Sequence, residues 1–112
     1  NMELIEKLQA QPASQSCRLI DFDKADLRTE EGGKRMFLVV SGEKPTVSMR
    51  VELRPLYYVM QPDYWGVEVV GCVSGIVLPA VAPYAEALDV THTMGKKGIE
   101  VLGANKTVTL NK

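Results

Sequence analysis

The chain has little of the chemistry on which most enzymes and metal sites depend. It contains one histidine and two cysteines among 112 residues, with 13 lysines and arginines against 14 aspartates and glutamates. The chain has a formal charge of −1 and so lacks the surplus of lysine and arginine that binding to nucleic acid phosphates requires. We therefore expect no nucleic acid partner. Because histidine and cysteine are so scarce, we also expect no metal site and no cofactor.

A long uninterrupted apolar segment is also missing. The longest apolar region, 69–82, is interrupted by Ser74, by glycines and by Pro79, and it is too short to cross a bilayer. We therefore expect no membrane partner. An apolar content of 46% with 24% charged residues is ordinary for a folded domain, and the length favours a single β-rich domain over 1–112.

The N-terminal residues lack the features of a secretory signal. Asn1 precedes Met2, and we interpret Asn1 as a tag remnant and Met2 as the natural start. The residues that follow are acidic and amphipathic, with no positive region and no continuous apolar stretch. We therefore expect a cytoplasmic protein in which Cys17 and Cys72 stay reduced and pack as small buried hydrophobes.

Helical periodicity is confined to the beginning of the chain. Leucine and isoleucine side chains share one face of the segment 2–11, and Pro12 follows it, which predicts one short N-terminal helix. From about residue 16 onward the apolar period changes to two, so we expect strands over 16–112.

Strict alternation of apolar and polar residues is clearest over 46–54. The segment 34–41 precedes it across a turn at 42–45, and together they predict an antiparallel hairpin. The other strand candidates are 17–23, 56–61, 66–73, 84–91, 98–102 and 107–110. Seven or eight short strands separated by turn residues predict a mainly β fold, an antiparallel sandwich or barrel.

Two seven-residue segments, 66–72 and 98–104, match with four identities. They are either equivalent strands related by an approximate two-fold axis or simply two strands that lie between tight turns. In each, a glutamate alternates with apolar residues, which favours an outward position for Glu68 and Glu100. If the two carboxylates instead flanked a cavity, they would be able to divide acid and base roles.

His92 is the only imidazole and lies where a strand runs into a turn. A histidine in this position is typical of a surface or structural residue. It would take part in catalysis only if it faced a pocket that also contains a carboxylate. The alternative function is therefore a small cytoplasmic hydrolase or isomerase that uses His92 with Glu68 or Glu100. The acidic run at 21–26 lacks the spacing of a calcium loop and is typical of a solvated strand end and turn.

Four of the seven aromatic residues lie within nine positions: Tyr57, Tyr58, Tyr64 and Trp65. Tyrosine and tryptophan combine a large apolar body with a polar tip, so this group suits either a ligand-binding surface or the edge of a core. The second unusual segment, 75–83, is almost entirely apolar, yet Pro79 and Pro83 exclude it from a central strand.

An exposed apolar loop of this kind favours contact with another subunit or another protein. We therefore predict a binding or protein-interaction module that acts through the aromatic cluster and the 75–83 loop. Its partner is expected to be a second copy of the chain or another protein.

Overall fold

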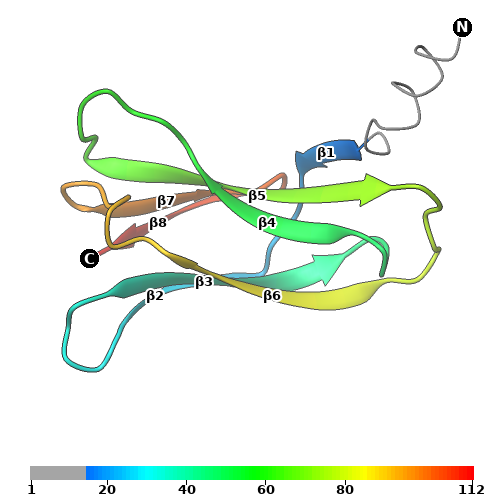
Figure 1. The fold of residues 1–112 in the computed structure, drawn as a ribbon, viewed down its shortest axis with the longest axis horizontal. Helices are drawn as coiled ribbons and strands as arrows, with labels where there is room; N and C mark the ends of the chain where they lie inside the picture. The colour runs from blue at the N-terminus through cyan, green and yellow to red at the C-terminus, as the bar shows by residue number, and fades with distance from the viewer. Residues whose placement is uncertain (1–14) are drawn as a thin grey trace, which may run out of the picture.

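The computed structural model describes residues 15–112. In this part of the chain, segments in which apolar and polar side chains alternate form eight strands. The strands form two sheets, which appear as an upper and a lower layer in Figure 1. The sheets remain separate, so the fold fits a sandwich and not a closed barrel. The helix expected over 2–11 lies outside the described residues. Within 15–112 no helix is long and apolar enough to cross a membrane.

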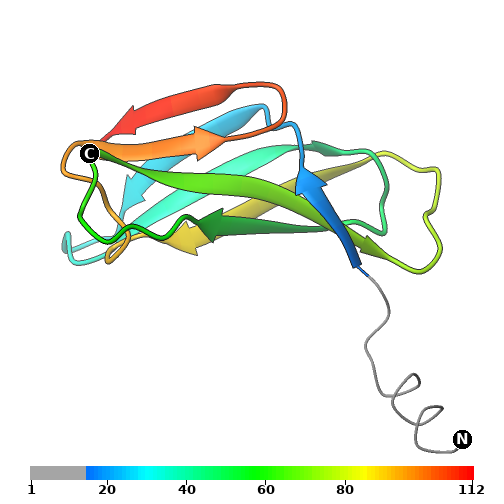
Figure 2. The same cartoon turned by 90° about the horizontal axis from the view of Figure 1, so that it is seen from above.

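The larger sheet is built around β5, the longest strand. It contains β1 (Gln15–Leu19), β4 (Arg50–Pro55), β5 (Tyr64–Ser74), β7 (Gly98–Leu102) and β8 (Thr107–Asn111). One edge of β5 pairs with β4, and its other edge pairs with β7 and then β1 (Figure 2). The β5–β7 pair is parallel, whereas the other pairs are antiparallel. The smaller sheet contains β2 (Lys24–Thr29), β3 (Met36–Lys44) and β6 (Ala82–Asp89), with β3 in the centre.

The core lies between the two sheets. Its largest fully buried side chains are Ile20, Phe22, Leu38, Val40, Val67, Val69, Val90, Ile99 and Val101. Full burial of each such side chain stabilises the fold by roughly 1.5–3 kcal/mol. The expectation that the valines beside Glu68 and the apolar residues beside Glu100 face the core is confirmed.

The predicted hairpin between 34–41 and 46–54 is wrong. β3 pairs with β2 and β6, whereas β4 pairs with β5, so the two segments belong to different sheets. Met49 is buried as the alternation requires, but the segment before it forms a turn that crosses between the layers. Alternation reports that one face of a segment is buried, but it does not report which strand lies beside it.

The predictions for two other segments also differ from the structure. Residues 56–61 form a loop and belong to none of the strands of the described chain. The acidic run at 21–26 is only partly a turn, because β2 begins at Lys24. Ala25 and Leu27 are half-buried there and pack against the core between charged neighbours. A strand with only two modest apolar side chains gives too weak a period to be recognised from the sequence.

The two cysteines are not reduced thiols: Cys17 and Cys72 form a disulfide. The residues are direct partners in the β1–β5 register, with Cα atoms 4.1 Å apart. They are separated by 55 residues in the sequence, and closing a loop of that size stabilises the folded chain by about 4 kcal/mol in the loop-entropy treatment. The sequence alone does not show this pairing, because register decides which residues lie opposite each other.

Gly98, the first residue of β7, offers a test of the sheet packing. Its φ is +156°, and a Cβ there would clash with the carbonyl oxygen of Leu110 on β8. Gly33 also has a positive φ, +74°, but the space around it is open. We expect Gly98→Ala to lower the free energy of unfolding by more than about 2 kcal/mol and Gly33→Ala by only about 1 kcal/mol. Urea unfolding of both variants measures this, and equal losses would contradict it.

Tyr84 of β6 provides a second test, this time of pH dependence. It is buried, and its hydroxyl donates a hydrogen bond to the backbone oxygen of Asp21 at 2.6 Å. Burial, followed by the charges of Asp23 and Asp21, raises the pKa of Tyr84 to about 12. The unfolded chain loses this proton near its ordinary pKa of about 10, so between these two values the folded state holds the extra proton.

The free energy of unfolding is therefore expected to fall as the pH rises from about 10 to about 12, by about 2–3 kcal/mol from this residue. Tyr84→Phe removes the titrating group and its hydrogen bond, so it is less stable at neutral pH but loses less stability on alkalinisation. Urea unfolding of both proteins across this range compares the slopes. Parallel slopes would show that Tyr84 does not titrate as described.

Candidate functional site

Exposed large apolar side chains of the described chain gather mainly beyond the two ends of β5. Before the strand begins, the 56–63 loop exposes Tyr57, Val59 and Met60. After the strand ends, the 75–81 loop and the neighbouring turn expose a second group, which we name the apolar tip: Val47, Ile76, Val77, Leu78 and Val81. Because β5 runs most of the length of the sandwich (Figure 2), the two groups lie at opposite ends of it.

The apolar tip contains most of the segment that the sequence analysis singled out at 75–83. Ile76 is 83% exposed and Val81 is 66% exposed, although both are aliphatic. The backbone N–H of Val47 donates a hydrogen bond to the Ala80 oxygen at 2.7 Å, and the hydroxyl of buried Thr46 donates one to the Leu78 oxygen. These bonds fix the loop against the 45–49 turn, so its apolar side chains project from an anchored backbone.

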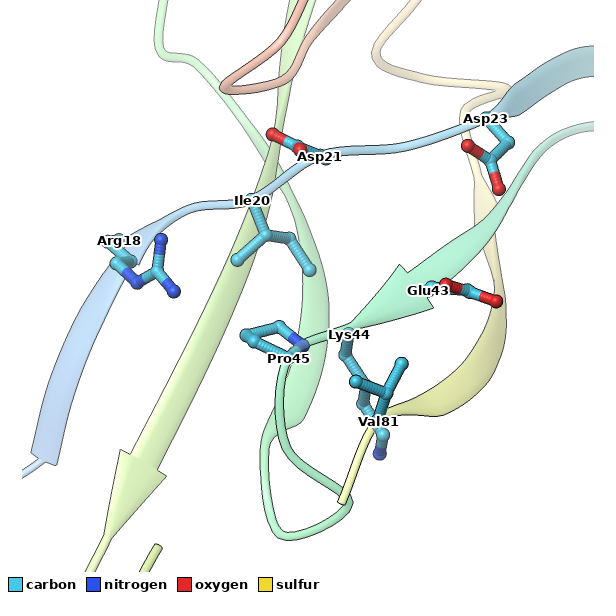
Figure 3. A pocket seen from close by; sticks show the side chains of 8 residues that line it. All are labelled: Arg18, Ile20, Asp21, Asp23, Glu43, Lys44, Pro45 and Val81. Atoms are coloured by element: carbon cyan, nitrogen blue, oxygen red, sulfur yellow. The ribbon is translucent and has the colours of Figure 1, made fainter. Parts of the chain in front are cut away.

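A hollow of about 360 Å³ lies beside the apolar tip and shares Val81 with it (Figure 3). It is lined by Arg18, Ile20, Asp21, Asp23, Glu43, Lys44, Pro45 and Val81. Figure 3 shows that the charged side chains are spread around the hollow and do not converge on one point. No group of residues within 15–112 is arranged to hold a metal ion. The hollow therefore offers charges of both signs at the edge of an apolar surface.

Tyr58 and Trp65 serve the fold. Their rings pack edge to face, with centroids 5.2 Å apart. The indole Nε1–H of Trp65 donates to the Leu56 oxygen at 2.9 Å, and the hydroxyl of Tyr58 accepts from the Gly66 N–H at 3.2 Å. These contacts fasten the 56–63 loop onto the beginning of β5.

The other two predicted aromatic residues lie apart from this pair. Tyr64 donates a hydrogen bond from its hydroxyl to Asn111 Oδ1 at 2.6 Å, which joins β5 to the end of β8. Tyr57 is 89% exposed and is the one member of the group that presents its ring freely to solvent. The four aromatic residues therefore do not form the common binding surface that their spacing suggested.

His92 is exposed in the segment between β6 and β7. It lines a second hollow at the opposite end from the apolar tip, together with Gly33, Lys34, Met36, Gln61, Trp65, Thr91, Met94 and Lys112. No aspartate or glutamate lines this hollow. The nearby Asp89 accepts hydrogen bonds from the hydroxyl and the N–H of Thr91, and these lower the pKa of Asp89.

Glu68 and Glu100 lie on the outer face of the larger sheet, because their neighbours in β5 and β7 face the core. The two strands run parallel, and their register pairs Gly66 with Glu100 and Glu68 with Leu102. Parallel neighbours that turn the same residues toward the core are related by a shift, so the first of the two alternatives, an approximate two-fold axis, does not apply, and the segments are two strands of similar pattern. The structure does not bring either glutamate into the hollow of His92, so the catalytic combination has no geometric support.

The sequence alone did not predict one group on the outer face of the larger sheet, which consists of Arg54 and the Cys17–Cys72 disulfide. The Arg54 Nη2 atom lies 3.4 Å from the Cys72 Sγ and 3.9 Å from the Cys17 Sγ. Arg54 and Arg50 each form a 2.7 Å ion pair with Glu52, and the hydrogen bond from Arg54 is the main cause that lowers the pKa of Glu52. Alternation over 46–54 places the three charged residues on one face, but only the β4–β5 register brings them to the disulfide.

Comparison of the chain with protein-family models, with curated proteins and with solved structures found no match in any of the three. Its function has to be inferred from the geometry of its own residues.

Proposed function

We propose that this chain is a protein-interaction module that associates with a second copy of itself through the apolar tip. The observation that carries the proposal is the exposure of five aliphatic side chains at one end of the sandwich. A contiguous exposed apolar patch is typical of an interaction site, because its contact with water is unfavourable and burial relieves it.

The anchoring of the loop strengthens this proposal. Its backbone is hydrogen-bonded to the 45–49 turn through Thr46 and Val47. A surface that is already ordered loses less conformational entropy when it docks than a freely moving loop does. The tip is therefore well suited to bind as it stands.

The charges beside the tip favour a second copy as the partner. Arg18 and Lys44 are positive, whereas Asp21, Asp23 and Glu43 are negative, and all five line the hollow that Val81 shares. In a two-fold dimer the same patch meets itself, so a patch that carries both signs can pair positive with negative groups. Docking on an anionic membrane would instead favour a purely basic surround.

Three expectations from the sequence stay predictions beside this one. The first is ligand binding through the aromatic residues, which would depend mainly on Tyr57 because its ring is the one of the four that is freely exposed. A hydrolase or isomerase built on His92 has no carboxylate in its hollow. The third is a cytoplasmic location, although the Cys17–Cys72 disulfide favours an oxidising compartment, where such bonds persist.

The double variant Ile76→Ser, Leu78→Ser tests the proposed interface. The wild-type chain is expected to form a concentration-dependent dimer in analytical ultracentrifugation. The double variant is expected to weaken the dimer at least about tenfold, equivalent to about 1.4 kcal/mol, because two apolar side chains no longer drive association. The matched control is Val59→Ser, since Val59 is 91% exposed but lies at the opposite end of the sandwich. It should dimerise like the wild type.

A wild-type chain that remains monomeric up to about 100 μM would contradict the proposal. A dimer that survives the double variant, or that is weakened equally by Val59→Ser, would place the interface elsewhere. Binding of a monomeric chain to phosphatidylserine-containing vesicles, lost in the double variant, would assign the tip to a membrane surface instead.

A further inference from the structure

The Cys17–Cys72 disulfide is asymmetric in its exposure. Cys17 is exposed on β1, whereas Cys72 is only 4% exposed on β5. Thiol–disulfide exchange begins when a thiolate reaches one of the two sulfurs, so access decides which sulfur is attacked. Because Cys17 is the exposed residue of the pair, we infer that its sulfur is the one attacked and that the Cys72 sulfur departs.

The charges around Cys72 suit a departing thiolate. The guanidinium of Arg54 donates toward the Cys72 Sγ at 3.4 Å, and a neighbouring cation favours the charged form of a thiol. Glu52 is the nearest anion, but it is shared by the two cations Arg54 and Arg50. Glu68 also belongs to this face and is the register partner of Arg54, but the ion pair of Arg54 is with Glu52, and Glu68 lies four residues from Cys72 along β5, or about 13 Å. The immediate surroundings of the sulfur therefore carry net positive charge.

We propose that the Cys17–Cys72 disulfide is a thiol-exchange site for low-molecular-weight thiols of the glutathione type. The incoming thiol releases its proton to solvent, and its thiolate attacks the Cys17 Sγ. A new sulfur–sulfur bond forms there while the Cys17–Cys72 bond breaks, and the bonding electron pair leaves with the Cys72 Sγ beside Arg54. The product carries a mixed disulfide on Cys17 and a thiolate on Cys72. One disulfide is exchanged for another, so no further oxidant or reductant is needed.

This reaction does not require the core to open. All five residues of β1 are exposed, and both cysteines belong to the outer face of the larger sheet. The buried side chains that hold the sheets together lie on the other face of β5. Exchange therefore proceeds from the folded protein, and its rate is proportional to the concentration of thiol.

The first experiment uses the full oxidised chain and reduced glutathione in native buffer. The reaction is quenched with N-ethylmaleimide, and peptide mass mapping locates both adducts. We expect glutathione on Cys17 and N-ethylmaleimide on Cys72, with an initial rate that rises linearly with glutathione. Glutathione predominantly on Cys72, or a rate that does not depend on glutathione because unfolding limits it, would overturn the proposal.

The second experiment tests the positioning role of Arg54. Arg54→Gln removes the charge beside the leaving sulfur and is expected to slow exchange about three- to tenfold. Arg54→Lys keeps a positive charge and should restore much of the rate. Arg50→Gln is the matched control, because Arg50 also pairs with Glu52 and lies directly opposite Cys72, yet its guanidinium makes no hydrogen bond to either sulfur.

The control should remain within about twofold of the wild-type rate. Equal rates for Arg54→Gln and Arg50→Gln would show that Arg54 does not act on the leaving sulfur. Urea unfolding with the disulfide intact checks that neither variant has lost its fold. The double variant at Ile76 and Leu78 should exchange at the wild-type rate, so a failure of self-association does not affect this test.

Discussion

The alternation of side chains along β5 is the constraint on which the rest of the structure depends. Val67 and Val69 face the core with no exposed surface, so Glu68 and Cys72 must face outward. Three strands pair with β5, and each inherits its inward and outward positions from this register. A shift of one residue would bury Glu68 and expose the valines, which the burial energy forbids.

The position of β5 determines where two surface features lie: the disulfide with Arg54, and the apolar tip. The outward face of β5 carries Cys72, and its register with β1 and β4 brings Cys17 and Arg54 to it. The end of β5 releases the apolar loop, and Thr46 holds that loop to the turn before β4. Neither group therefore depends on the aromatic residues or on His92, which lie toward the other end of the sandwich.

Local periodicity was sufficient to predict most strands of this fold but not their partners. The segment 98–102 matches β7, and 66–73 lies within β5, because each has strong alternation between turn residues. The predicted hairpin of 34–41 with 46–54 is wrong, because a turn can either reverse the chain within one sheet or carry it to the other sheet. The 75–83 loop was recognisable from its prolines, whereas the disulfide depends on a register between segments that are 55 residues apart.

The position of the disulfide also determines what its opening would change. Cys72 lies two residues before the end of β5, so the bond to Cys17 fastens β1 to the strand end from which the apolar loop emerges. The loop itself is attached elsewhere, through the hydrogen bonds that Thr46 and Val47 make with its backbone. Those bonds contain no sulfur and belong to the turn between the sheets. Exchange at Cys17 would loosen β1 while the backbone of the apolar tip stays anchored, so the proposed thiol exchange and the proposed self-association are expected to be structurally independent.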